Sequence, residues 1–338
     1  MPKVCLVTID GKFSRSDAYH KALDLESLMD HIKRLGHEVS TLEVDELASI
    51  DLSTYDSNTF FAFGGHLNPE VNKYYEDVAY FMYSSGAKLL PSLDMILSYE
   101  NKGLQGLLSR KLGIDYLSQT YHYKAYDDAV YQKWPIVYKT VSGAGSSGVR
   151  LVSSNEKIRH LYLCASILSV PVGRILPILK YRIGSFFDKF IAGAQSRNNQ
   201  IKPHHRFVLQ EFSEGLSFDY KVLIFFDIVY VLKRKVRPDD FRASGSGDFA
   251  FVDVDEELLE FSYDVLRKSA SPYLSLDIIW ANEKYSIIEY QALHFGPYTQ
   301  INAPFFYKRI SEGRWERIRK IISLESCYAY AISNFVED

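Results

Sequence analysis

Cysteine is scarce in this chain. Only 3 are present among 338 residues, and Cys5, Cys164 and Cys327 lack the spacing of metal-binding motifs. We therefore expect reduced, structural thiols in a cytoplasmic protein, which argues against a disulfide framework. A basic and then apolar leader is also missing, because residues 3–9 enter an apolar run directly. We predict no signal peptide.

Long apolar runs and a strong charge imbalance are lacking too. The longest apolar stretch, residues 161–179, contains Arg174 and two prolines, which makes it a poor membrane span. The formal net charge is −3 and charged residues make up 24%, so nothing indicates disorder or nucleic-acid binding. A hydrophobic content of 47% is ample for a buried core, and the length predicts two or three structural units.

Strand-like and helix-like segments alternate in the first ninety residues. Apolar runs at 3–9, 39–44, 59–63 and 87–90 predict strands, and 16–35 has a helical period. This alternation is typical of a small α/β unit with a parallel sheet, which we end near residue 97. Later helices are predicted at 101–112, 256–269 and 315–335. Later strands are predicted at 135–140, 149–152, 206–212, 220–226 and 228–235, with a hairpin of 274–280 and 285–290.

A glycine-rich loop, Ser-Gly-Ala-Gly-Ser-Ser-Gly, lies between two of these strands. Glycine allows the backbone to approach phosphate oxygens closely, serine adds donors, and a lysine at the strand end adds charge. The loop is not a Walker A sequence. The alternative, a flexible hairpin loop, stays open. The residues assigned to phosphate binding are Lys139, Ser142, Gly143, Gly145, Ser146, Ser147 and Gly148.

Two acids occur inside apolar strand runs. On adjacent antiparallel strands Asp277 and Glu289 could face each other, and Gln291 shares a strand face with Glu289. Two carboxylates and an amide oxygen suit magnesium, and an unpaired carboxylate among isoleucines costs too much to bury. A salt bridge to a lysine or arginine would meet the same need, so both interpretations stay open.

A group of cations lies on the strands predicted at 220–226 and 228–235 and in the segment that follows them. Positive charge stabilises a transferring phosphoryl group, and arginine is the best bidentate donor. The alternative is a solvated edge strand, but a polar glycine loop resembling a substrate clamp follows. The group consists of Lys221, Lys233, Arg234, Lys235, Arg237 and Arg242.

In chain order these pieces resemble the ATP-grasp superfamily. The resemblance covers roughly residues 91–303, and its order and the Asp277–Glu289 spacing are more specific than any single motif. The matching pieces are Lys102 in Glu-Asn-Lys, Lys139, the loop 142–148, Gln210-Glu211, Asp219-Tyr-Lys221 and Asp277…Glu289-Tyr-Gln291.

Two branches of the superfamily are especially similar. The ribosomal-protein glutamate ligases share the patterns around Asp219-Tyr-Lys221 and Asp240-Phe-Arg242-Ala-Ser244. ATP-grasp proteins of bacterial surface-polysaccharide clusters share Asp-Phe-Arg-Ala-Ser-Gly-Ser-Gly and Gln-x-x-His-Phe-Gly-Pro. Two departures matter. Gln291 replaces the usual Asn. Lys221 replaces Arg, so a compact ammonium group stands where the family has a planar guanidinium that can bind through two N–H groups.

The resemblance implies an α/β (α+β) protein with the ATP-grasp fold. An N-terminal α/β domain at 1–97 would precede a lid subdomain at 98–212 and a catalytic, mixed-sheet subdomain at 213–338. ATP and Mg²⁺ are the implied cofactors, with two ions expected and Mn²⁺ as a substitute.

The resemblance also assigns roles to individual residues. Lys221, Arg234 and Arg242 would be catalytic, and Asp277, Glu289 and Gln291 would hold the metal. Lys102, Lys233, Gln210 and Glu211 would join the loop residues in binding ATP. Substrate would contact Asp219, Arg237, Asp240, Ser244 and His294. For His294, hydrogen bonding to nearby loop backbone is the alternative.

Residues 157–206 form a basic insertion with nine Lys or Arg and one acid, a local net charge of +8. Within it an apolar stripe at helical spacing runs beside basic residues. This predicts either a lid helix packed on the protein itself or, through 172–191, a peripheral contact with the inner face of the membrane.

The implied activity is an ATP-dependent carboxylate–amine ligase acting through an acyl phosphate. Its partners would be a small-molecule or glycan carboxylate and an amine, in polysaccharide biosynthesis, without nucleic acid, and a dimer is expected. The alternatives are a small-molecule kinase and a nucleotide-binding regulatory module without turnover.

Overall fold

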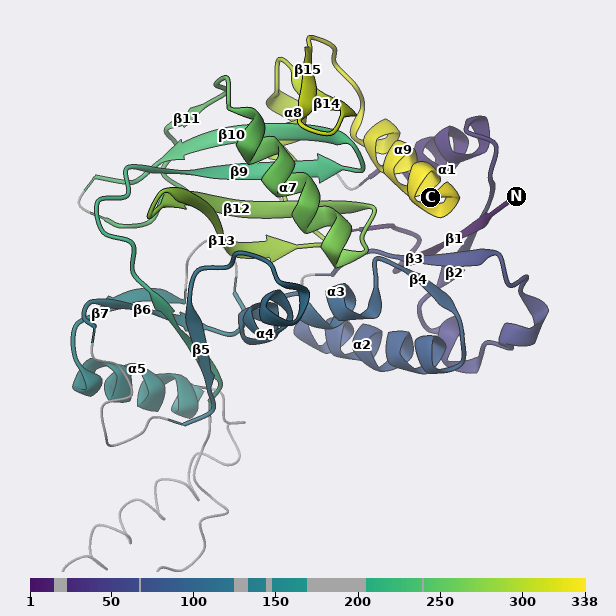
Figure 1. Cartoon of the computed structure of the whole chain (residues 1–338). Coiled ribbons are helices and arrows are strands. Elements are labelled where there is room, and N and C mark those ends of the chain that lie inside the picture. Colours follow the sequence, from purple (N-terminus) through teal and green to yellow (C-terminus); the bar gives the residue numbers. More distant parts are fainter. Residues whose placement is uncertain (15–22, 67, 125–132, 144–147, 169–204, 239) are drawn as a thin grey trace, which may run out of the picture. The chain divides into compact units, whose positions relative to one another are not determined.

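The computed structural model describes residues 1–14, 23–66, 68–124, 133–143, 148–168, 205–238 and 240–338. The chain divides into two compact units (Figure 1). One joins Met1–Leu117 with Ser213–Asp338, and the other is Ser118–Phe212. The sequence predicted three segments, at 1–97, 98–212 and 213–338. That three-part division stays a prediction; in the structure residues 98–117 belong to the same unit as both chain ends.

The first unit begins with a four-stranded parallel sheet in the order β2-β1-β3-β4. Successive residues of β1 alternate between two cores, as the strand period requires. Val4 and Leu6 contribute to a core shared with the helices at Leu25–Arg34 and Leu324–Glu337. Cys5 and Val7 contribute to a second core, shared with the helices at Pro69–Ser84 and Leu93–Ser98. The elements are β1 (Lys3–Thr8), α1 (Leu25–Arg34), β2 (Glu38–Glu43), β3 (Thr59–Phe63), α2 (Pro69–Ser84) and β4 (Lys88–Leu90), with short 3-10 turns at Glu46–Ser49 and Leu52–Thr54.

A seven-stranded sheet forms the rest of this unit. Its order is β13-β12-β9-β10-β14-β15, with β11 paired to β10, and all these pairings are antiparallel. Its strands are β9 (Phe218–Phe225), β10 (Ile228–Lys235), β11 (Phe249–Ala250), β12 (Tyr273–Ala281), β13 (Lys284–Gln291), β14 (Phe306–Ser311) and β15 (Arg314–Ile318). The remaining helices are α3 (Leu93–Ser98), α4 (Lys102–Leu112), α7 (Glu256–Ser269), α8 (Tyr298–Asn302) and α9 (Leu324–Glu337).

Alternation along β9 gives the large sheet two buried faces. Val222 and Ile224 pack with residues of α7, which lies across the strands in Figure 1. Leu223 and Phe225 pack on the opposite face with residues of α1 and α9. Each face is closed by helices, so charged side chains on these strands need partners within the protein.

The predicted C-terminal helix at 315–335 is wrong in its first part. Trp315 lies in β15, and the helix begins only at Leu324, where the Ser323 side chain accepts a hydrogen bond from the Ser326 amide at 3.1 Å. Gly313 has a φ of 66° and forms the tight turn that pairs β14 with β15. Glycine reaches this conformation without steric cost, and that tertiary pairing outweighs the helical pattern.

The second unit contains an antiparallel sheet in the order β5-β8-β6-β7. Its core joins Ile136, Tyr138 and Phe207 of the sheet to Ile158 and Tyr162 of the helix. The elements are β5 (Gln119–His122), β6 (Ile136–Thr140), β7 (Val149–Val152), α5 (Asn155–Leu168) and β8 (Phe207–Glu211).

The predicted apolar and basic stripe at 172–191 lies outside the described residues. Of the helices that the structure describes, none has the length and apolar character needed to cross a membrane.

Candidate active site

One face of the large sheet changes from apolar to charged along its strands. Phe225 pairs with Tyr273 in the hydrophobic core, and further along the same two strands Lys221 pairs with Asp277. These positions share a face because side chains alternate with a period of two. The face that packs against α9 at one end therefore presents ionised groups at the other.

Four side chains at the charged end form one ion network, which we call the central cluster: Asp219, Lys221, Arg234 and Asp277. Arg234 donates from Nε and Nη2 to the two carboxylate oxygens of Asp219, at 2.7 and 2.8 Å. The same Nη2 lies 3.0 Å from Asp277 Oδ2. Lys221 Nζ donates to Asp277 Oδ1 at 2.8 Å. Only 9% of the Arg234 side chain and 4% of the Asp219 side chain is exposed, so these bonds replace lost hydration.

The network affects the two carboxylates differently. Burial opposes ionisation of Asp277, but Arg234 and Lys221 outweigh it and hold its pKa below the ordinary value. For Asp219 burial outweighs the attraction of Arg234 and raises the pKa. Asp277 is thus the more strongly stabilised anion because it contacts two cations.

A β-bulge decides what Asp277 faces on β13. From the turn, Ala281 pairs with Lys284 and the register continues regularly to Ile278 and Ile287; it then shifts, so that Asp277 pairs with Glu289. Without the extra residue Asp277 would face Ile288. The Tyr116 hydroxyl donates to the Ile288 carbonyl at 3.0 Å and so satisfies the bulged backbone.

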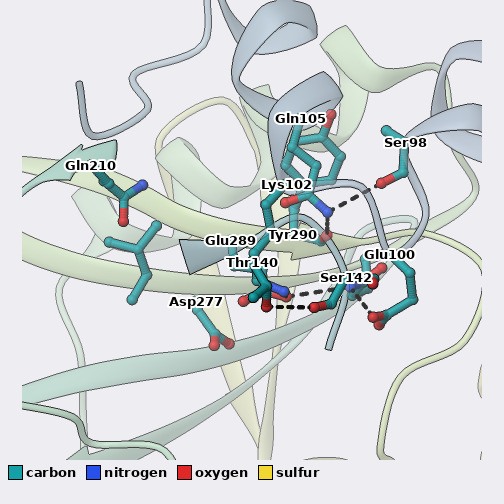
Figure 2. A network of polar contacts seen from close by, with 12 residues as sticks. Ser98, Glu100, Lys102, Gln105, Thr140, Ser142, Gln210, Asp277, Glu289 and Tyr290 are labelled. Carbon is teal, nitrogen blue, oxygen red and sulfur yellow. Dashed lines mark hydrogen bonds and ion pairs between the residues drawn. The ribbon is translucent and has the colours of Figure 1, made fainter. Parts of the chain in front are cut away.

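The first turn of α4 supplies a cation to Glu289. Lys102 is buried, and its Nζ lies 3.2 Å from Glu289 Oε1. Asn101 begins the helix by accepting a hydrogen bond from the Leu104 amide at 3.1 Å. Gln105, one turn on, donates through Nε2 to the Tyr290 carbonyl at 2.8 Å (Figure 2). These bonds fix α4 against β13 beside the acids.

The predicted metal ligands Asp277, Glu289 and Gln291 are neighbours in the structure. Within the described ranges, no group of three His, Cys, Asp or Glu side chains could hold a metal ion, and both carboxylates contact lysines. The set nevertheless fits a hard divalent cation, because all its donors are oxygen atoms. In addition, Gln291 Oε1 is buried and has no hydrogen-bond partner among the residues that the structure describes.

The cationic loop after β10 is held largely by its own side chains. Asp240 accepts bonds from the guanidinium of Arg242, including one at 2.7 Å from Nη2, and this contact lowers the pKa of Asp240. Arg237 donates from Nη2 to the Ser244 carbonyl. Lys233 lies with Nζ 3.6 Å from the centroid of the Phe218 ring. These residues are gathered at one end of β10, and their predicted contacts with substrate or ATP stay predictions.

His294, three residues after Gln291, contacts segments that follow β1 and β3 of the N-terminal sheet. It is buried, and its Nδ1 is 3.2 Å from the Ser14 hydroxyl. A Cβ added at Gly65 would come within 2.6 Å of His294 Cβ, so the two segments pack tightly. The substrate role predicted for His294 stays a prediction.

The other predicted ATP-binding residues belong to the second unit. Lys139 and Gln210 are buried on β6 and β8, whereas Glu211 is exposed at the end of β8. The glycine-rich loop starts and ends in a hairpin, because the Thr140 amide donates to the Gly148 carbonyl at 3.0 Å. Ser142 and Gly143 are described, and Gly143 has a φ of 125°. Gly145, Ser146 and Ser147 lie outside the described residues.

Solved structures identify the fold. A D-cycloserine synthetase has a TM-score of 0.56 and 11% identity, covering 98% of this chain and 99% of that one. A RimK domain ATP-grasp protein from Sphaerobacter thermophilus has a TM-score of 0.53 and 10% identity, covering 98% of each chain. An ATP-grasp ligase of Chryseobacterium gregarium, in complex with ADP and a leader and core peptide, has a TM-score of 0.54 and 12% identity, covering 99% and 96%. No protein-family model and no curated sequence matches this chain. The chain has the ATP-grasp fold, as the order of its motifs predicted.

Sequence reasoning missed two residues of this region. Gln105 could have been noticed as a polar residue on the buried face of an amphipathic helix. Glu100 stands within the Glu-Asn-Lys triplet that marked Lys102, but its backbone has a φ of 51°, which no sequence pattern indicated.

Proposed function

We propose that this protein is an ATP-dependent ligase that joins a carboxylate to an amine. The observation that carries the proposal is the pairing of Asp277 with Glu289, on an ATP-grasp fold, with Lys102 and the central cluster in contact. The synthetase and ligase names of the compared structures support the same class.

Asp277, Glu289 and Gln291 would hold Mg²⁺ in this proposal. Bound there, the ion would neutralise charge on the nucleotide phosphates and orient them. Lys102 is buried beside Glu289 and would contact a phosphate oxygen. In the structure Lys221 forms an ion pair with Asp277, and Lys102 forms one with Glu289. When nucleotide and metal bind, these two ammonium groups would have to move from the carboxylates to phosphate oxygens.

The proposed reaction has two steps. A carboxylate oxygen of the substrate attacks the γ-phosphorus, the bond to ADP breaks, and an acyl phosphate forms. The amine nitrogen then attacks the acyl carbon, and inorganic phosphate leaves with the bonding electrons and takes up the proton that the amine loses. Arg234 and Lys221 would supply positive charge during the transfer, which is the main requirement of phosphoryl chemistry.

Isotope transfer tests this proposal. The purified protein is incubated with ATP, Mg²⁺, amines and a panel of ¹⁸O-carboxylates, and its products are followed by mass spectrometry. A ligase gives ADP, an amide and phosphate carrying one ¹⁸O from the acid. ADP with a stable phosphorylated product would indicate a kinase. Failure to bind Mg²⁺ and a nonhydrolysable ATP analogue would overturn the proposal altogether.

A further inference from the structure

Glu100 adopts an unusual backbone conformation beside the candidate metal ligands. It lies between α3 and α4 with a φ of 51°, a region that residues other than glycine seldom adopt. Such strain persists only where surrounding structure enforces it, and it is concentrated at functional sites. The next residue, Asn101, caps α4 and fixes the chain direction at this point.

The side chain of Glu100 contacts Gln291. Gln291 Nε2 donates to Glu100 Oε1 at 3.2 Å and to Glu289 Oε1 at 3.4 Å. Figure 2 shows the separate side chains of Glu100 and Glu289. A carboxylate can only accept, so both contacts require the NH₂ end of the amide and decide its orientation. The oxygen end, Oε1, is the buried atom without a hydrogen-bond partner among the described residues.

We propose that Glu100 is a positioning residue that holds the Gln291 amide so that Oε1 serves as a ligand to a divalent cation. This inference rests on the proposed function, in which Gln291 binds the metal. Glutamine has one more rotatable bond than asparagine, so its amide is less restricted and gains more from a second contact. Groups that orient metal ligands in this way change metal affinity by about 10–100-fold when they are removed.

Mn²⁺ binding provides a readout independent of turnover. The full-length chain with a nonhydrolysable ATP analogue is titrated with Mn²⁺, and free Mn²⁺ is measured by electron paramagnetic resonance. We expect Glu100→Gly to weaken Mn²⁺ binding about 10–100-fold. Glycine adopts the positive φ without strain, so its thermal midpoint should not fall below that of the wild type. Glu100→Gln keeps an acceptor oxygen at the same length and should recover most of the affinity.

A double-mutant cycle with Gln291→Asn separates positioning from any general effect of the negative charge. The shorter asparagine amide should lose the bond to Glu100, so Glu100→Gly should cause little further loss in that background. Equal Mn²⁺ affinity in Glu100→Gly and the wild type would overturn the inference. An equal loss of Mn²⁺ affinity from Glu100→Gly in the wild type and in the Gln291→Asn variant would also overturn it, because Glu100 would then act independently of Gln291. If the wild type itself binds no Mn²⁺ with the analogue, the proposed function fails and this inference fails with it.

Discussion

The central cluster can be compared with a second ion cluster on the same sheet. In this rim cluster, Arg309 of β14 donates from Nε and Nη2 to the Glu260 carboxylate of α7, at 2.9 and 3.0 Å. Trp315 donates to Glu260 at 2.7 Å, and Arg309 lies 4.3 Å from the centroid of the Tyr263 ring. Both clusters contain a bidentate arginine–carboxylate pair. However, the side chains of Arg309 and Glu260 are 20% and 29% exposed, against 9% and 4% for Arg234 and Asp219.

This difference in exposure shows at which cluster the ionised side chains lose favourable hydration. A partly exposed pair keeps part of its hydration and contributes modestly to stability. A buried network loses its hydration, and apolar side chains of similar volume would often be equally stable. Local packing therefore explains the rim cluster. The burial of the central cluster, at a cost in hydration, instead indicates that its charges have a chemical role.

The largest expected effect is on stability when the centre of the buried network is removed. Arg234→Met leaves two buried carboxylates short of a cation, so we expect the free energy of unfolding to fall by about 3–5 kcal/mol. Urea denaturation measures it. The matched variant Arg234→Met with Asp219→Leu should lose less, because one uncompensated charge is gone. A loss no greater than that of an arginine variant in the rim cluster would mean that the central cluster is effectively solvated.

The next effect separates chemistry from folding. Under the proposed function, Glu289→Ala should reduce ATP turnover at least about 100-fold, because it removes a metal ligand and not only a group that orients one. Steady-state ADP release at saturating Mg²⁺ measures this, and circular dichroism checks the fold. As a control, Glu260→Ala removes a carboxylate of the rim cluster and should leave turnover near the wild-type value. Normal turnover in Glu289→Ala would refute the metal assignment.

Acidification should distinguish Asp277 from an ordinary surface carboxylate. Its folded pKa is lowered, so its stabilising contribution is present above the unfolded pKa, about 3.9, and is lost as pH falls through the folded pKa. The difference in unfolding free energy between the wild type and Asp277→Asn should therefore be largest near neutral pH and shrink in acid. Urea denaturation at pH 7, 5 and 3 measures it. A difference that grows on acidification would reverse the assigned direction.

The smallest expected effect belongs to the rim cluster. Arg309→Met should lower the free energy of unfolding by roughly 1 kcal/mol, since it removes a partly exposed pair and a cation–π contact. This loss should decrease in 1 M salt, where the Debye length is about 3 Å. The loss in Arg234→Met should change less with salt, because its charges are shielded from solvent ions by burial.

Several features followed from the sequence alone because they depend on local spacing. The apolar strand predicted at 59–63, the β-branched strand predicted at 135–140 and the helix ending at Gly113 appear within one residue of where their patterns predicted them. Gly113 has a φ of 63°, the left-handed conformation that ends many helices. The joint order of the motifs from Lys102 to Gln291, together with the Asp277–Glu289 spacing, predicted the ATP-grasp fold that the solved structures support.

The tertiary structure decided how those residues meet. The sequence predicted that Asp277 and Glu289 lie on the two strands of a hairpin. With a regular register, Ile288 would face Asp277. The β-bulge, where the Tyr116 hydroxyl bonds the Ile288 carbonyl, brings the two acids opposite each other. Likewise, no local pattern could indicate that Arg234 would contact both Asp219 and Asp277. Such contacts join residues far apart in the chain, and their geometry depends on register, burial and backbone strain, which arise only when the sheet is assembled.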